Sequence, residues 1–482
     1  MIKKEYQYPV RVMLAEGGIE QPEKWFVPQS LQVGIATPPP YCVHILGQAS
    51  VVLDFGKEMR ATLRIICHYV TKDGQRAWAP VRVRFGESVS ECCAELGERG
   101  AGNDHALRDF RILVGGNSDE CWGNSGFRFV RLDFLEDGMD IYIKSVLAVG
   151  EILDLPVRYT YEGQDPLIRN IYDTARRTVD LCAAGEYVWD GVKRDRLVWV
   201  GDMHPEMLAL CTLYGRLPAM ERSLLFLRDT TPQGEWINCV ATYSAWWVIV
   251  LADYYNMTGC ADFVAPLLSY AEGIVRQYLG VVGADGSLHF DGQFVLVDWP
   301  THGQPDEMAG VRALLLFMAK RAAALFAKMA YPAGSAVELI SRLSQQPITV
   351  THSMQVAALK YMANGELPRE DVELLRRTGA EGMSTFMSYY ILTAYARYFG
   401  KEAALSLMKT YYGAMLSRGA TTFFEDFSMG WLEGSGRIDE FPAEGERDLH
   451  GDFGAFCYVG FRHSLCHGWS AGVIRFLADM GC

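Results

Sequence analysis

The amino-acid sequence lacks the features that would indicate an extracellular or membrane protein. No C-x-x-C motif repeats, and the cysteines are scattered apart from the adjacent Cys92 and Cys93, so neither a zinc site nor a disulfide framework is indicated. Charged residues and a proline interrupt the N-terminal MIKKEYQYPV, which is not a secretory signal, and no apolar run has the length of a membrane span. We therefore expect free thiols, a cytoplasmic location and no membrane partner.

Positive charge is also scarce. The chain has 45 Lys and Arg residues against 58 Asp and Glu residues, which gives a formal net charge of -13. Proteins that bind a phosphate backbone do so through clusters of Lys and Arg, so nucleic acid is not an expected partner. The acidic balance by itself identifies no ligand.

Residues 1–158 show short β-like runs separated by turn residues. In VRVRFG and FRFVRLDF, apolar positions alternate with Arg, which is typical of an antiparallel sheet with one face in water. We predict an N-terminal antiparallel β-sandwich over 1–158, with strands at 50–56, 61–70, 81–86, 127–135 and 139–150.

After Asp165 and Pro166 the apolar residues adopt helical spacing, and the remainder of the chain is predominantly helical. About a dozen helices in pairs favour a closed ring of helical hairpins, that is, an (α/α)6 toroid over 159–482. A helical solenoid is the alternative. The protein is therefore predicted to be a multi-domain β plus α chain. The predicted helical segments are 166–184, 205–214, 218–228, 243–257, 261–279, 307–329, 334–345, 353–363, 369–377, 384–399, 402–416 and 468–480.

The loops of the helical region concentrate Trp, Asp, Glu and His, as expected where rigid elements present a functional site. These loops lie at 187–206, 290–303, 419–434 and 461–472. The polar, Gly-rich stretch 434–453 is either an excursion over the mouth of the ring or a disordered insert.

The segment WDGVKRDRLVWVGD at 189–202 has the highest density of charged and aromatic residues. Burying such charges is costly unless they pair or bind a ligand. Carboxylates accept hydrogen bonds from sugar hydroxyls, indoles stack on a pyranose, and an arginine such as Arg194 holds a carboxylate in position. The alternative is an Arg–Asp network that caps the helix starting near Asp202. We favour a sugar site because two tryptophans flank the charges.

This segment resembles the signature of the bacterial α-L-rhamnosidases of glycoside hydrolase family 78. The resemblance implies that Asp190 and Asp202 contact substrate hydroxyls and that Trp199 forms part of the wall. It places Asp195 at the position of the general acid, where many members have Glu, so the side chain here is one methylene shorter.

A second carboxylate is required because inverting glycosidases use a base about 6.5 to 9.5 Å from the acid, with water between them. GATTFFE at 419–425 resembles the family motif Gly-Ala-Thr-Thr-x-x-Glu, whose Glu is the general base, and this implies that role for Glu425. The mechanism expects an acid with a raised pKa and an ionised Glu425. Glu206 and Glu235 are the reserve acids, which means the next candidates for the general acid if Asp195 does not have that role. For Glu425, the alternative interpretation is a carboxylate that caps a helix.

Two further matches add binding residues. SLCH at 464–467 resembles the closing Ser-Leu-x-His segment of the family, which implies that His467 contacts the substrate beside Trp469. A structural histidine is the alternative. Asp298 and Trp299 are similar to an Asp-Trp pair in the same toroid and would form another wall.

The sequence therefore predicts an inverting glycosidase that removes a terminal α-L-rhamnosyl or related sugar from a carbohydrate substrate. A carbohydrate-binding relative without turnover and a glycosidase of the same fold for another sugar are the alternatives. The mechanism calls for neither a metal nor a cofactor, and self-association into a homo-oligomer is left open.

Overall fold

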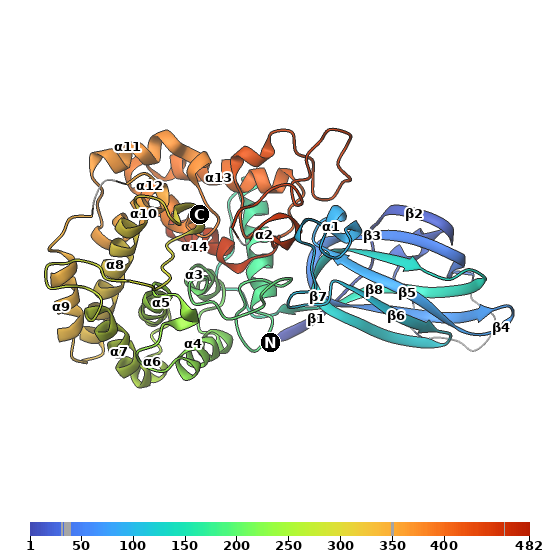
Figure 1. Cartoon of the computed structure of the whole chain (residues 1–482), viewed down its shortest axis with the longest axis horizontal. Coiled ribbons are helices and arrows are strands. Elements are labelled where there is room, and N and C mark those ends of the chain that lie inside the picture. The colour runs from blue at the N-terminus through green and yellow to red at the C-terminus, as the bar shows by residue number, and fades with distance from the viewer. Residues whose placement is uncertain (30–31, 33–39, 349–350, 457) are drawn as a thin grey trace.

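The computed structural model describes residues 1–29, 32, 40–348, 351–456 and 458–482. Figure 1 shows a curled antiparallel sheet on the right, from the N-terminal part of the chain, beside a helical half on the left. This arrangement confirms the predicted combination of β and α parts. The last strand ends at Leu153 and the first long helix begins at Pro166, so the predicted domain boundary near 158 falls in the connection between them.

The strands of the described chain form one antiparallel sheet in the order β1-β8-β3-β7-β5-β6, with β2 and β4 also paired to β3. The long β3 pairs with both β7 and β8 through several register shifts, which bend a strand and increase its twist. The predicted strand runs fall in β3, β5, β7 and β8, whereas β1, β2, β4 and β6 were not predicted. The strands are β1 (Ile2–Gln7), β2 (Arg11–Glu20), β3 (Val43–Lys72), β4 (Gln75–Arg76), β5 (Trp78–Gly86), β6 (Asp109–Gly115), β7 (Ser118–Phe134) and β8 (Met139–Leu153).

The expectation that the alternating arginines face water was wrong for two of them. Arg84 is buried and pairs with Asp133 at 2.7 Å. Arg128 is also buried, and it pairs with Asp54 at 2.8 Å and with Asp439 at 3.1 Å. Because Asp439 belongs to the helical half, this part of the sheet packs against protein, and buried arginines need such partners.

The predicted helices are present with small changes at their ends. Pro266 lies where the segment 261–279 divides into α6, a 3-10 turn and α7, and the last segment begins as a 3-10 turn at 468–472. The helices are α1 (Val89–Cys93), α2 (Pro166–Cys182), α3 (Met203–Tyr214), α4 (Pro218–Thr230), α5 (Tyr243–Thr258), α6 (Ala261–Val264), α7 (Leu268–Leu279), α8 (Glu307–Lys328), α9 (Gly334–Leu343), α10 (Met354–Asn364), α11 (Arg369–Thr378), α12 (Ser388–Phe399), α13 (Lys401–Ser417) and α14 (Val473–Asp479).

Six of these helices contact one another in a closed cycle. α3 contacts α5, and the contacts continue through α8, α10, α12 and α14 back to α3. Burial follows from this position: α5 is buried on all sides from Tyr243 to Tyr254, including Trp246 and Trp247, as expected for a helix enclosed by protein. α11, outside the cycle, keeps a charged outer face.

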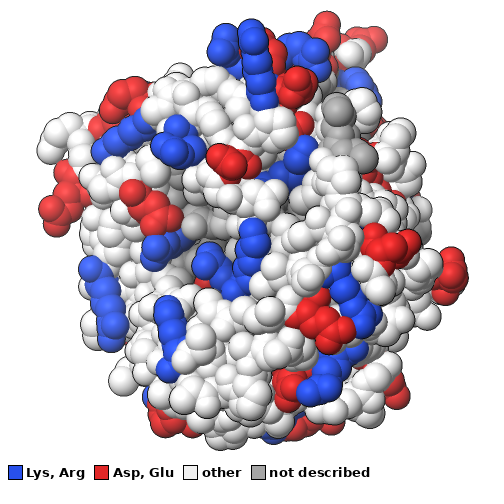
Figure 2. Space-filling view, turned by 90° about the vertical axis from the view of Figure 1, so that its left-hand side faces the viewer, with Lys and Arg blue, Asp and Glu red and all other residues white. Residues whose placement is uncertain are grey.

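The surface of the helical half carries charges of both signs. Figure 2 shows Lys and Arg side chains intermingled with Asp and Glu around a central hollow on this face. Such mixing differs from the basic patch that binds nucleic acid. No helix in the described ranges combines the length and apolar composition needed to cross a membrane. The cysteines within those ranges are free thiols.

Candidate active site

A cavity of about 340 Å³ brings together the loops that the sequence singled out. Of the residues predicted to be catalytic or substrate-binding, leaving the reserve acids aside, Asp298 alone does not line it. The lining residues are Asp190, Arg194, Asp195, Trp199, Val240, Tyr243, Asp202, Phe294, Leu296, Trp299, Glu425, Tyr458, Arg462, His467 and Trp469.

The cavity wall forms where the loop between α2 and α3 pairs with the segment before α14. Gly191 and His467 form an isolated β-bridge, and the N–H of Gly468 donates to the carbonyl of Asp190 at 2.7 Å. The Asp190 side chain accepts a hydrogen bond from the N–H of Leu197 at 2.9 Å, which closes the loop on itself. Asp190 and His467 are thereby held on adjacent backbones.

Asp195 and Arg196 have left-handed backbone conformations, with φ of 56° and 54°. A non-glycine residue in this region is strained by about 1 to 3 kcal/mol, and such strain is frequent at functional sites. The Arg196 guanidinium lies 4.6 Å from the centre of the Trp189 ring, and the Arg60 guanidinium lies 3.9 Å from it. Trp189 therefore supports the turn and is not among the cavity residues.

Arg194 joins the two predicted catalytic carboxyls. Its Nη1 lies 2.8 Å from Asp195 Oδ2, and its Nη2 donates to Glu425 Oε1. The Arg194 side chain is buried, and its guanidinium lies 5.5 Å from the centre of the Tyr458 ring. A single guanidinium thus lies between the carboxyls of Asp195 and Glu425 and sets their separation.

Glu425 is fully buried, and its Oε2 accepts a hydrogen bond from the N–H of Ser464 at 3.1 Å. Burial raises the pKa of Glu425 to about 7, although the positive charge of Arg194 acts to lower it. Sequence reasoning expected this group to stay ionised, but at neutral pH its ionisation is only partial. The helix-capping alternative was wrong, because the nearest following helical turn is capped by Ser428.

His467 lies among three carboxyl groups. Its Nε2 is 3.5 Å from Glu425 Oε1, 3.6 Å from Asp202 Oδ1 and 3.9 Å from Asp190 Oδ2. Burial lowers the pKa of His467 well below its usual value and raises the pKa values of Asp190 and Asp202 well above theirs. The His467 imidazole is therefore neutral at pH 7, and burial favours the protonated form of both carboxyls, so the cluster offers donors as well as acceptors. The capping alternative for Asp202 was wrong, because its side chain makes no cap hydrogen bond.

Aromatic side chains complete the cavity. The Trp199 ring meets Tyr243 edge to face at 6.0 Å, and Trp299 meets Tyr458 in the same way at 5.7 Å. Tyr243, Tyr458 and Arg462 were not predicted. Tyr458 and Arg462 just precede the SLCH motif, and that proximity was the available signal. Such a mixture of aromatic faces and convergent polar groups is typical of a small-molecule pocket.

Three predicted residues lie outside the cavity lining. The Asp298 side chain caps the turn that begins at Trp299 and accepts a hydrogen bond from Ser384. Glu206 is buried on α3, where its carboxylate oxygens have no hydrogen-bond partner among the described residues. Glu235 is exposed. Asp298 therefore supports Trp299 from behind. Neither reserve acid lines the cavity, although the Glu206 carboxyl lies against Gly468, between the cavity residues His467 and Trp469.

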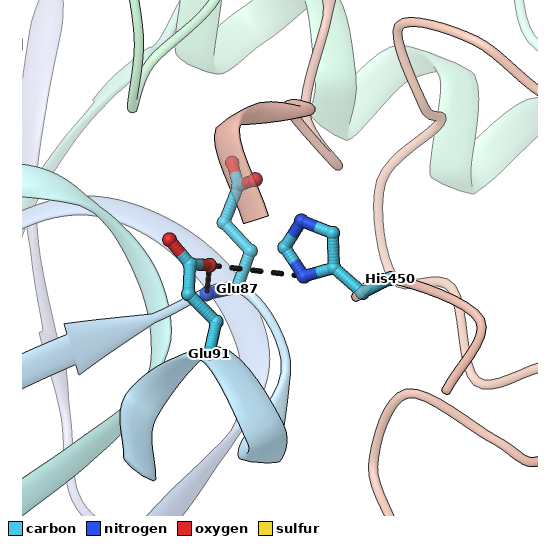
Figure 3. A group of neighbouring side chains, drawn as sticks. All are labelled: Glu87, Glu91 and His450. Carbon is cyan, nitrogen blue, oxygen red and sulfur yellow. Dashed lines mark hydrogen bonds and ion pairs between the residues drawn. The ribbon is translucent and has the colours of Figure 1, made fainter. Parts of the chain in front are cut away.

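A second buried acid cluster lies between the sheet and the helical half. Figure 3 shows Glu87 and Glu91, the latter on α1, facing His450 from the opposite loop, and these three residues have the spacing of metal ligands. The Lys193 Nζ lies 3.1 Å from Glu87 and 3.2 Å from Glu91, and it donates to the carbonyl of His463 at 2.7 Å. The Lys193 ammonium, together with the buried Arg108 guanidinium 3.9 Å from Glu91, supplies the positive charge of this cluster.

Comparisons with known proteins identify the fold. No family model and no curated protein matches the chain. Among solved structures, a rhamnosidase from Klebsiella oxytoca with rhamnose bound has a TM-score of 0.78 at 20% identity, covering 100% of this chain and 96% of that chain. A family 78 rhamnosidase of Bacillus sp. GL1 has a TM-score of 0.70 at 17% identity, covering 95% of this chain and 48% of that chain.

An α-L-rhamnosidase from Aspergillus terreus is also similar, with a TM-score of 0.66 at 18% identity, covering 89% of this chain and 52% of that chain. The chain thus spans nearly all of the Klebsiella protein and about half of the other two. Identities this low show the fold alone. The resemblance predicted from the sequence motifs is confirmed at that level: the whole chain has the fold of the family 78 α-L-rhamnosidases.

Proposed function

We propose that this protein is a glycoside hydrolase that removes a terminal α-L-rhamnosyl or related sugar with inversion, with Asp195 as general acid and Glu425 as general base. The observation that carries the proposal is the placement of both carboxyls on one guanidinium, that of Arg194, at the wall of one cavity. The likeness to solved rhamnosidases, one of them with rhamnose bound, supports the choice of sugar.

In this mechanism Asp195 donates a proton to the leaving oxygen while the bond from that oxygen to the anomeric carbon breaks. Glu425 accepts a proton from a water molecule that attacks the anomeric carbon from the opposite face, so the configuration inverts. Glu425 must be ionised for this step, and its pKa of about 7 makes it a base suited to neutral or slightly alkaline pH.

The remaining cavity residues are assigned to binding. Asp190, Asp202 and His467 would exchange hydrogen bonds with sugar hydroxyls, because carboxyl and imidazole groups can accept hydrogen bonds and their protonated atoms can donate them. The indoles of Trp199, Trp299 and Trp469 offer apolar faces to the C–H side of a pyranose. A cavity of about 340 Å³ suits one terminal sugar unit.

The finer architecture is part of the same proposal. The closed cycle from α3 to α14 supports an (α/α)6 toroid over 159–482, and the curled sheet supports a sandwich over 1–158. Free thiols among the described cysteines fit a cytoplasmic location. Self-association into a homo-oligomer stays a prediction, to be measured by light scattering. The mechanism assigns no step to a metal or cofactor.

The test is release of p-nitrophenol from a panel of p-nitrophenyl glycosides by the wild type, Asp195→Asn and Glu425→Gln. We expect turnover of the α-L-rhamnoside by the wild type and its loss in Glu425→Gln. Asp195→Asn should show a smaller decrease on this substrate, because p-nitrophenolate needs little protonation to leave. Turnover of a different glycoside would keep the mechanism and replace the sugar. Absence of turnover, together with calorimetric binding of L-rhamnose, would instead favour a carbohydrate-binding protein.

A further inference from the structure

The backbone of Asp195 is held by a residue from the sheet half of the molecule. The N–H of Asp195 donates to His105 Nδ1 at 2.9 Å, and the same Nδ1 lies 3.3 Å from Asp195 Oδ1. Because His105 Nδ1 accepts this hydrogen bond, the ring carries its proton on Nε2. His105 lies on the loop that leads into β6, far from Asp195 in the sequence.

The loop that carries His105 is fixed at both ends. Asn103 Oδ1 accepts hydrogen bonds from the N–H groups of Arg108 and Asp109, each at 2.9 Å, and this ties the loop to the start of β6. Asp104 Oδ2 accepts from Arg462 Nε at 3.2 Å, and Arg462 lines the cavity. His105 is therefore presented by a loop that is fastened to both the sheet and the cavity wall.

A second contact from the sheet holds the next residue. The Arg196 guanidinium donates to the carbonyl and to the side-chain oxygen of Asn124, on β7, at 2.9 and 3.0 Å. Asp195 and Arg196 are the two left-handed residues of the turn, and a strained backbone persists only where its surroundings fix it. His105 and Asn124 thus fix both residues of the turn from outside the helical half.

We propose that His105 is a positioning residue for the general acid: by accepting the Asp195 N–H, it fixes the direction in which the Asp195 carboxyl points. This inference rests on the proposed function. If His105 acts only through Asp195, its loss must impair protonation of the leaving oxygen and spare the attack of water. A basic leaving group needs that proton, whereas p-nitrophenolate departs readily without it.

The test compares methyl and p-nitrophenyl α-L-rhamnoside as substrates for His105→Leu, which removes the acceptor, and His105→Asn, whose side-chain oxygen can replace Nδ1. For His105→Leu we expect kcat on the methyl glycoside to fall about tenfold and kcat on the p-nitrophenyl glycoside to change less than about twofold. His105→Asn should restore most of the loss. His44→Leu is the matched control, because His44 is bonded to Asp140 on the sheet, away from the cavity.

Asp195→Asn should show the same selectivity to a greater extent, with a larger loss of kcat on the methyl glycoside than on the p-nitrophenyl glycoside. If it does, and His105→Leu affects both substrates equally or neither, the positioning role is overturned and the proposed function stands. If the wild type cleaves neither these substrates nor any other glycoside of the panel, the proposed function is overturned and this inference with it. A loss in His105→Leu that His105→Asn does not restore would also contradict the hydrogen-bond argument.

Discussion

Lys193 and Arg194 are neighbours in the chain, yet their side chains pair with two different clusters of buried carboxyl groups. The Lys193 ammonium is enclosed by Glu87, Glu91 and backbone carbonyls. The Arg194 guanidinium joins Asp195 and Glu425 at the wall of a cavity. The first cluster is closed to a ligand, because the cavity that it borders is only about 20 Å³, whereas the second faces a cavity of about 340 Å³. The comparison teaches that buried charge alone does not mark a site, and that charge beside an aromatic-walled cavity does.

The largest expected effect comes from the open cluster. Glu425→Gln removes the proposed base, so kcat on the α-L-rhamnoside should fall about 10² to 10⁴-fold. The glutamine oxygen can still accept the Ser464 N–H, so urea denaturation should give nearly the wild-type free energy of unfolding. Activity close to that of the wild type would remove Glu425 from the mechanism.

A change in the closed cluster around Lys193 should lower stability and leave substrate binding unchanged. Lys193→Met leaves Glu87 and Glu91 buried without their cation, so the free energy of unfolding should fall by about 3 to 5 kcal/mol. The KM of the molecules that remain folded should stay near the wild-type value. Lys57→Met, which breaks the partly exposed pair with Glu5, is the control and should cost less than about 1 kcal/mol. Equal losses in the two variants would break the comparison.

A pH profile sharpens the comparison further. The reaction needs Glu425 ionised while Asp195 carries a proton, and burial gives Glu425 a pKa of about 7. Over the pH range in which Asp195 carries that proton, kcat/KM should rise with pH through about 7. Below that point it should fall about tenfold per pH unit. Because Arg194 acts to lower the pKa of Glu425, Arg194→Gln should move this rise to higher pH. A rise centred near pH 4 would mean that an unperturbed carboxylate is the base.

The smallest effect concerns metal ions. Added Zn²⁺ should change the wild-type Tm by less than about 1 °C, because the Lys193 ammonium already pairs with Glu87 and Glu91. The ligand atoms of Glu87, Glu91 and His450 lie within 4.8 Å of one another. Zn²⁺ should therefore raise the Tm of Lys193→Met, in which the competing ammonium is absent. Zinc stabilisation of the wild type would show that the first cluster is a metal site.

Local sequence pattern was sufficient to predict the helices and the site loops. The apolar spacing of α5 and α8 and the charged, Trp-rich loops are local features, and Asp195, Glu425 and His467 were each found within a short motif. The fold then brought these motifs to one cavity. Sequence reasoning also placed Asp298 at the wall, but its side chain is used to cap the turn at Trp299.

Long-range partners could not be predicted in this way. Glu87 and His105 lie in the sheet half, and no local pattern connects them with Ser464 or Asp195. The burial of Arg84 and Arg128 depends on segments that pack on the sheet from elsewhere in the chain, so alternation alone pointed to water. Likewise, the raised pKa of Glu425 follows from desolvation, which only the three-dimensional fold determines.

The central claim is that Asp195 and Glu425 act as an acid and base pair across the Arg194 guanidinium. Its most direct test is NMR observation of the first sugar released from p-nitrophenyl α-L-rhamnoside by the wild type. The account predicts that β-L-rhamnose forms first and then mutarotates. Initial release of α-L-rhamnose would indicate a covalent, retaining mechanism and would contradict it.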